Sequence, residues 1–157
     1  MKKLLLVAIL ATLSFSAFAQ KGAVDLLPKI GYQTEHKRFL VGVEGRYSIT
    51  DNIRLAPDIQ VLFPKDHLTG MDVNINVHYL IPLTQELSFY PFVGGAMLNN
   101  RYSNSGHTNS FTDFGLNLGA GLSYDITDNG YLDFQFKYTI VDGKDPAYFT
   151  LGYGIRF

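Results

Sequence analysis

The sequence predicts an all-β fold: a closed antiparallel eight-stranded up-and-down transmembrane β-barrel, preceded by a cleavable signal peptide. About eight segments of roughly ten residues alternate between apolar and polar side chains, which is the period of a strand with two unlike faces. Roughly ten residues is also the length that a tilted strand needs to cross a bilayer. The chain starts with an export signal, and no later segment has the run of about 18 apolar residues that a membrane helix requires.

The first residues have the three parts of a secretory signal. Met1-Lys2-Lys3 is positively charged, residues 4–13 are mostly apolar, and Ala17-Phe18-Ala19 matches the A-x-A cleavage pattern. The apolar run is short for a helix that spans about 30 Å of hydrocarbon, so a permanent membrane helix is the weaker alternative. We expect cleavage near Ala19/Gln20, which leaves a signal peptide over 1–19 and an outer-membrane β-barrel domain over 20–157.

The expected strands follow one another along the rest of the chain. The cleanest alternation lies in residues 71–81, and the least clear in 87–98, where Tyr90 and Phe92 face opposite to Phe89 and Val93. Residues 99–110 are polar and rich in turn-forming types, and we expect them to form the longest loop. In chain order, the expected strands cover residues 24–33, 38–49, 53–61, 71–81, 87–98, 113–124, 132–140 and 149–157.

Composition narrows the function classes. The formal net charge of −1 provides neither a basic field for nucleic acid nor an acidic tail, so we expect no nucleic-acid partner. Charged residues make up 17% of the chain, against about 25% in soluble domains, and Tyr and Phe supply the whole aromatic fraction of 14%. The chain has no cysteine, which excludes disulfides, thiol chemistry and a lipid anchor on cysteine.

The last expected strand alternates strictly from Phe149 to Phe157. A closed barrel needs its final strand to pair with its first, because unpaired backbone groups are not tolerated in lipid. Within this strand four residues resemble the C-terminal insertion signal of bacterial outer-membrane β-barrels: Thr150, Gly152, Ile155 and Phe157.

Three tyrosines recur at one position relative to tight turns. Tyr47, Tyr79 and Tyr124 each precede by two residues an isoleucine at the start of a turn, and these turns are alternate connections at one end of the sheet. We interpret the tyrosines as part of an aromatic girdle at the lipid–water boundary, with short periplasmic turns at this end and longer loops at the other. Common ancestry of the hairpins is the alternative explanation of the repeat.

Alternation alone does not say whether the apolar face meets lipid or a core. A secreted lipocalin-like barrel turns its apolar face inward, and its outer face is expected to be rich in Lys and Glu. Here the polar face has many small and amide residues and similar numbers of both charges, and the apolar face has essentially no charge. We therefore expect a lumen charge network and keep the soluble ligand-binding barrel as the alternative. The expected network comprises Asp25, Lys29, Glu44, Arg46, Arg54, Asp58, Asp72, His78, Asp113, Asp133, Lys137 and Arg156.

From about Gln20 to Phe157 the chain resembles the small outer-membrane β-barrels of the OmpA/OmpX type. The resemblance rests on the signal peptide, the number of strands, the unequal turns and the final Phe157. It implies a place in the outer membrane of a Gram-negative-type cell, contact with outer-membrane lipid and lipopolysaccharide, and a monomeric state. It also implies assembly by periplasmic chaperones and the barrel-assembly machinery. It specifies a fold better than an activity.

Catalysis, cofactors and metals find little support in the residues. Some small outer-membrane barrels are lipid A deacylases or acyltransferases, and such chemistry needs a serine activated by a histidine. The last two expected strands contain neither residue type. His36, His67, His78 and His107 are too dispersed for a local metal site, and the spacing of Asp142 and Asp145 is not that of an EF-hand. We expect no enzymatic activity, no cofactor and no metal.

Two kinds of membrane function remain. A narrow porin-like channel is one, but a barrel of about eight strands is filled by its own side chains, so we expect little or no conductance. The other is a structural or surface-interaction role, such as adhesion or ligand contact, through the outer loops. In the long loop the candidate contact residues are Arg101, Tyr102 and His107. A solvated loop without a partner is the alternative.

Overall fold

A computed structural model describes residues 22–143 and 145–157; the expected signal peptide over 1–19 lies outside them. Within these ranges no helix is long and apolar enough to cross a membrane. The regular elements are the strands β1 (Val24–Gln33), β2 (Arg38–Ser48), β3 (Ile53–Lys65), β4 (Leu68–Tyr79), β5 (Ile81–Pro82), β6 (Leu87–Asn104), β7 (His107–Asp125), β8 (Gly130–Ile140) and β9 (Ala147–Arg156).

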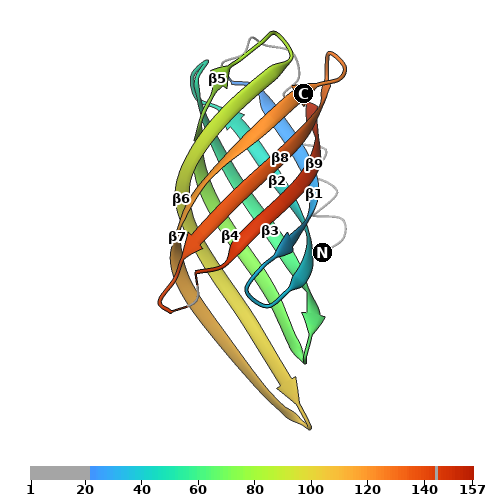
Figure 1. Cartoon of the computed structure of the whole chain (residues 1–157), viewed down its shortest axis with the longest axis vertical. Helices are drawn as coiled ribbons and strands as arrows, with labels where there is room; N and C mark the ends of the chain where they lie inside the picture. Colours follow the sequence, from blue (N-terminus) through green and yellow to red (C-terminus); the bar gives the residue numbers. More distant parts are fainter. Residues whose placement is uncertain (1–21, 144) are drawn as a thin grey trace.

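The strands form one closed antiparallel barrel (Figure 1). Each main strand pairs with its neighbours in the chain, β1 also pairs with β9, and β4 pairs with β6. Two-residue β5 is a short extension that pairs with the start of β6, so it adds no wall to the barrel. The structure therefore confirms the predicted eight-stranded up-and-down barrel, with the last strand closing on the first.

Three short turns lie at the end of the barrel that carries Phe157 (Figure 1). They join β2 to β3, β4 through β5 to β6, and β7 to β8. In each turn a threonine, Thr50, Thr84 or Thr127, accepts hydrogen bonds on Oγ1 from backbone N–H groups two or three residues further on. This shared local hydrogen bond gives a physical reason for the repeated turn sequence, since side-chain oxygens of threonine stabilise such turns.

At the opposite end, two hairpins project beyond the other connections (Figure 1). Here the expected loop over 99–110 is wrong: β6 runs to Asn104, β7 starts at His107, and only Ser105 and Gly106 form the turn. Both turn residues have positive φ, 45° and 88°, which is the conformation of tight two-residue hairpins. The strand signal was hidden because the hairpin is polar on both faces. Likewise β3 extends to Lys65, with a turn at Asp66 and His67.

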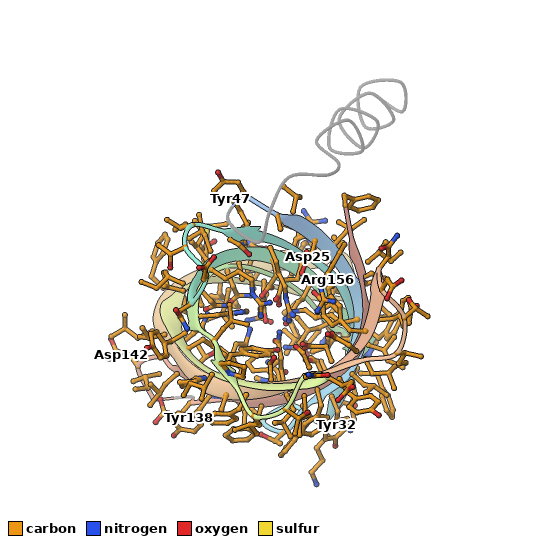
Figure 2. All side chains as sticks on the ribbon, turned by 90° about the horizontal axis from the view of Figure 1, so that it is seen from above. Asp25, Tyr32, Tyr47, Tyr138, Asp142 and Arg156 are labelled. Atoms are coloured by element: carbon orange, nitrogen blue, oxygen red, sulfur yellow. The ribbon has the colours of Figure 1, made fainter. Side chains whose placement is uncertain are left out.

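The apolar face of the sheet points outward. In β4, Ile75 is 57% exposed, whereas neighbouring Asn74 and Asn76 are each 1% exposed and face the lumen. Figure 2 shows nitrogen and oxygen atoms gathered inside the ring of strands, with Tyr32, Tyr47 and Tyr138 on its outer side. This orientation overturns the soluble lipocalin-like alternative, because an outer wall of exposed Ile, Leu, Val and Phe suits hydrocarbon and not water. It also resolves the ambiguous fifth expected strand, where Tyr90 and Phe92 are the buried residues.

Candidate functional sites: the filled lumen and the projecting sheet

A cluster of ion pairs occupies the part of the lumen toward the short turns. Lys29 Nζ lies 2.9 Å from Glu44 Oε2 and 3.2 Å from Asp58 Oδ2. Arg46 continues the cluster, with Nε 2.6 Å from Glu44 Oε1 and Nη1 2.9 Å from Asp133 Oδ2. All five side chains come from the inward positions of β1, β2, β3 and β8, and each is at least 98% removed from water. Opposite charges at these distances compensate one another's loss of solvent.

Buried hydroxyl groups complete the hydrogen bonds of this cluster. Tyr90 donates to both oxygens of Asp133, at 2.7 and 2.8 Å, and Ser123 Oγ donates to Asp133 Oδ2 at 2.6 Å. Tyr131 donates to Asp25 Oδ2 at 2.8 Å. Sequence reasoning missed the lumen tyrosines because aromatic residues are also the usual lipid-facing type. The glycines on the neighbouring strands could have indicated them. Tyr90 lies opposite Gly121 and Tyr131 opposite Gly154, and at each glycine a Cβ would overlap the tyrosine ring.

A second hydrogen-bonded chain lies toward the projecting hairpins. Tyr148 donates to Asp72 Oδ2 at 2.9 Å and accepts from Gln33 Nε2 at 3.0 Å. Arg38 then donates to Gln33 Oε1 and, at 3.1 Å, to Asn100 Oδ1. Lys137 lies over the Tyr148 ring, 4.3 Å from its centroid. Around this chain the lumen also contains an apolar cluster that the sequence analysis did not identify, formed by Leu40, Leu62, Ala96, Leu98, Val141 and Tyr148.

The structure places the proposed lumen residues as follows. Two of them, Asp113 and Arg156, are half-buried at the ends of the barrel, and Arg156 Nη2 lies 2.6 Å from Asp125 Oδ1. Arg54 has no carboxylate within 4.0 Å among the described residues; its Nε donates to His78 Nδ1 at 3.3 Å. The buried members are Asp25, Lys29, Glu44, Arg46, Arg54, Asp58, Asp72, His78, Asp133 and Lys137.

The outer wall carries the other proposed residues. Tyr47, Tyr79 and Tyr124 are about half exposed beside the three short turns, and Tyr153, which the sequence analysis did not assign, lies across the sheet from Leu132 in the same region. In β9, Thr150 faces the lumen and Ile155 faces outward, while the backbone N–H of Phe157 donates to the Val24 carbonyl at 2.9 Å. The proposed insertion signal thus lies on the strand that closes the barrel.

The projecting hairpins form a small sheet from the ends of β3, β4, β6 and β7. Tyr102 pairs with Leu68 of β4 and with Asn109 of β7, Arg101 is exposed on β6, and His107 starts β7. On its other side β7 pairs with β8 only from Leu116 onward. Residues 107–115 of β7 therefore have a strand neighbour on one side only. The three candidate contact residues lie on this ordered sheet and not on a loop.

These features define the chemical capacity of the molecule. The lumen is filled by five buried cations, five buried carboxylates and large aromatic residues, all from inward strand positions. In the part of the chain that the structure describes, no group of three or more His, Cys, Asp or Glu side chains could hold a metal ion. A filled polar lumen inside an apolar outer wall is the arrangement of an integral membrane β-barrel. The protein is an integral outer-membrane barrel of the small, eight-stranded class.

Comparison with known proteins specifies the family. The chain matches the family model described as "Outer membrane protein beta-barrel domain" over residues 5–157 and belongs to that family. It is similar to Outer membrane protein X of Escherichia coli (strain K12), at 27% identity over 89% of this chain and 82% of that protein. Its location is therefore the outer membrane of a Gram-negative-type cell.

Solved structures share the fold at low sequence identity. The N-terminal β-barrel domain of Pseudomonas aeruginosa OprF superposes with a TM-score of 0.77 at 22% identity, covering 87% of this chain and 98% of that one. Ail, the attachment invasion locus protein of Yersinia pestis, gives 0.66 at 16% identity, covering 87% and 99%. Neisserial surface protein A gives 0.66 at 18%, covering 85% and 94%. At these identities the likeness establishes the fold alone.

Proposed function

We propose that the barrel is a surface-interaction protein that binds extended segments of partner proteins along the free edge of β7. This edge, residues 107–112, lies beyond the connection from β8 to β9 and is the observation that carries the proposal. An unpaired row of backbone N–H and C=O groups is a template for an added strand, and strand addition is a common mode of peptide recognition.

The hairpin geometry identifies the available backbone groups. In a hairpin with a two-residue turn, the flanking pair Asn104 and His107 is hydrogen-bonded, and bonding then alternates along the strands. The N–H of Ser103 indeed points away from β7, to the carbonyl of His67 at 3.0 Å. Even-numbered residues of the edge therefore direct their backbone groups away from β6. These residues are Thr108, Ser110 and Thr112.

The opposite edge of the projecting sheet supports the proposal by contrast. There β3 ends in Pro64 and Lys65, and both residue types discourage the addition of another strand. The β7 edge carries neither proline nor lysine, and its Thr and Phe residues favour β-structure. The β3 edge is thus protected against the addition of a strand and the β7 edge is not, as expected if the β7 edge binds a partner strand.

The proposed partners also include the proteins that assemble the barrel and the lipids that surround it, and the proposed function involves no catalytic step. The insertion signal at Thr150, Gly152, Ile155 and Phe157 supports assembly of the exported chain by periplasmic chaperones and the barrel-assembly machinery. The closed wall supports a monomer that is surrounded by lipid and lipopolysaccharide. The histidine and the serine that face the lumen are engaged elsewhere: His78 bonds to Arg54, and Ser123 bonds to Asp133. One structural relative is named for attachment and invasion, which agrees with a surface role.

The test is a proline in the edge. Thr112→Pro removes an N–H that faces the free edge and keeps the backbone hydrogen bonds between β6 and β7. Thr112→Ala is the matched control, because both variants lose the hydrogen bond that Thr112 Oγ1 accepts from Asn99 Nδ2 at 2.9 Å. Fluorescence anisotropy would measure binding of labelled nine-residue peptides of alternating Thr and Val to each variant in nanodiscs. We expect wild type and Thr112→Ala to bind and Thr112→Pro to lose binding. Thr112→Lys provides a second edge-blocking variant. Equal binding by all four proteins would refute the proposal.

A further inference from the structure

Two lysines mark the outer boundary of the apolar wall on adjacent strands. Lys37 precedes Phe39 of β2 by two residues, and Lys65 follows Phe63 of β3 by two. Both lysines are exposed, and so are both phenylalanines, Phe39 at 67% and Phe63 at 48%. Paired strands thus change from aromatic to cationic at the same level, where a lipid headgroup region meets hydrocarbon.

The two ammonium groups are available for an anion. Lys65 Nζ donates one hydrogen bond to the Lys37 carbonyl at 3.2 Å, which holds it beside the β1–β2 turn and leaves two N–H donors. Neither lysine has a carboxylate within 4.0 Å among the described residues. Both also line a hollow of about 410 Å³ with Tyr102, Leu68 and the side chains of Glu35, His36 and Asp66.

Below the lysines the outer wall is grooved. A hollow of about 500 Å³ is lined by Ile30, Tyr32, Phe39, Val41, Phe63 and Phe149, among others. The Tyr32 and Phe39 rings meet edge to face with centroids 5.4 Å apart, and Figure 2 shows Tyr32 on the outer side of the barrel. A second hollow of about 440 Å³ shares Ile30, Val41 and Leu151 with the first. Together they form a continuous apolar groove across β2, β1 and β9.

We propose that Lys37, Lys65 and this groove form a binding site for one lipopolysaccharide molecule, with lipid A phosphate at the lysines and an acyl chain in the groove. This rests on the proposed surface orientation, in which the projecting hairpins face outward and the site lies in the outer leaflet. The chemistry of the two hollows favours a phosphorylated glycolipid: two adjacent ammonium groups suit a phosphate, and the groove suits an acyl chain. The upper hollow also holds the carboxylates of Glu35 and Asp66, which offer acceptors for sugar hydroxyls beside the ring face of Tyr102.

Native mass spectrometry of the intact barrel in detergent tests the site with three probes: diphosphorylated lipid A, lipid A from which both phosphates are removed, and dioleoylphosphatidylglycerol. The double variant Lys37→Gln/Lys65→Gln should retain diphosphorylated lipid A about thirty-fold more weakly than wild type, from the usual attraction of two lysines at a membrane surface. Arg156→Gln, which removes a cation at the opposite end of the barrel, should leave retention unchanged. Val41→Trp, which fills the groove, should weaken retention of both forms of lipid A.

The outcomes separate the two proposals. Equal weakening by Arg156→Gln, or equal retention of phosphatidylglycerol and lipid A by wild type, would overturn the specific site and leave only a general attraction to anionic lipid. Peptide binding to the β7 edge should be the same in the lysine variant and wild type. Loss of lipid A retention with intact peptide binding therefore supports this site independently, and the Thr112→Pro result bears on the edge alone.

Discussion

Replacement of Lys29 by methionine is the most informative perturbation of the lumen. Lys29 Nζ bridges Glu44 and Asp58, at 2.9 and 3.2 Å, and these two carboxylates are direct cross-strand partners of β2 and β3. Methionine has a similar length and no charge. Lys29→Met therefore keeps the packing, removes the bridging cation and leaves two buried like charges opposite each other.

The two carboxylates are affected unequally. Glu44 keeps Arg46 at 2.6 Å and two contacts from Gln135 Nε2, at 3.2 and 3.0 Å. Among the described residues Asp58 keeps one hydrogen bond, from the amide of Asn74 at 2.7 Å. Loss of one partner from a buried ion pair typically costs about 3–5 kcal/mol. We expect Lys29→Met to lower the free energy of unfolding by about that amount. Asp58→Asn in the same chain should recover at least about half, because it removes the uncompensated charge and keeps an acceptor for Asn74.

The assay is urea unfolding in lipid vesicles, read by the mobility of unboiled samples on a gel, since the chain has no tryptophan to report folding. Arg156→Met provides the control: its ion pair with Asp125, at 2.6 Å, is shorter than either pair of Lys29, but its side chains are 37% and 30% exposed, and it should contribute less than about 1 kcal/mol. If Lys29→Met costs no more than Arg156→Met, or if Asp58→Asn adds to the loss, the lumen cluster does not stabilise the barrel as argued.

Further predictions concern the outer wall, the lumen glycines and conduction. Ile75→Arg, on the lipid-facing side of β4, should lower the free energy of unfolding from vesicles by about 2–4 kcal/mol, whereas Ser103→Arg on the projecting sheet should have little effect; equal effects would contradict the membrane orientation. Gly154→Val should prevent folding because its side chain overlaps the Tyr131 ring, and Tyr131→Ala in the same chain should restore the folded band on a gel. Wild-type protein in planar bilayers should show no stable ohmic openings, because buried charges and rings fill the lumen; large openings from pure protein would contradict this.

The fold was predictable because one local property determines it. In a strand, successive side chains face opposite sides, so a run such as Met71 to Tyr79 reveals both its secondary structure and its two environments without any partner. The choice between lipid and core then followed from the absence of charge on the apolar face. Where both faces are polar, as in the β6–β7 hairpin beyond Asn99, this local contrast vanishes, and the expected loop was wrong.

The internal arrangement of the lumen depends on register, which alternation does not provide. The charges of Lys29, Glu44 and Arg46 were assigned to the interior, but their pairing with Asp58 and Asp133 requires the alignment of β1, β2, β3 and β8. Lumen tyrosines were missed for a related reason: Tyr90 and Tyr131 are distinguished from lipid-facing tyrosines only by glycines on the neighbouring strand. Cross-strand neighbours far apart in the chain hold the information that a single strand lacks.

The two ends of the barrel differ in a way that connects the fold with the proposed function. Inside the membrane every strand has two neighbours, so no edge exists and the wall is inert toward other chains. Beyond the membrane β8 leaves the sheet at Ile140, while β7 continues and has a free edge from Thr112 to His107. The filled lumen makes the barrel a rigid base, because its charges are fixed by partners on several strands. A rigid base that presents one unpaired strand holds that strand extended before a partner arrives, which lowers the entropy cost of strand addition.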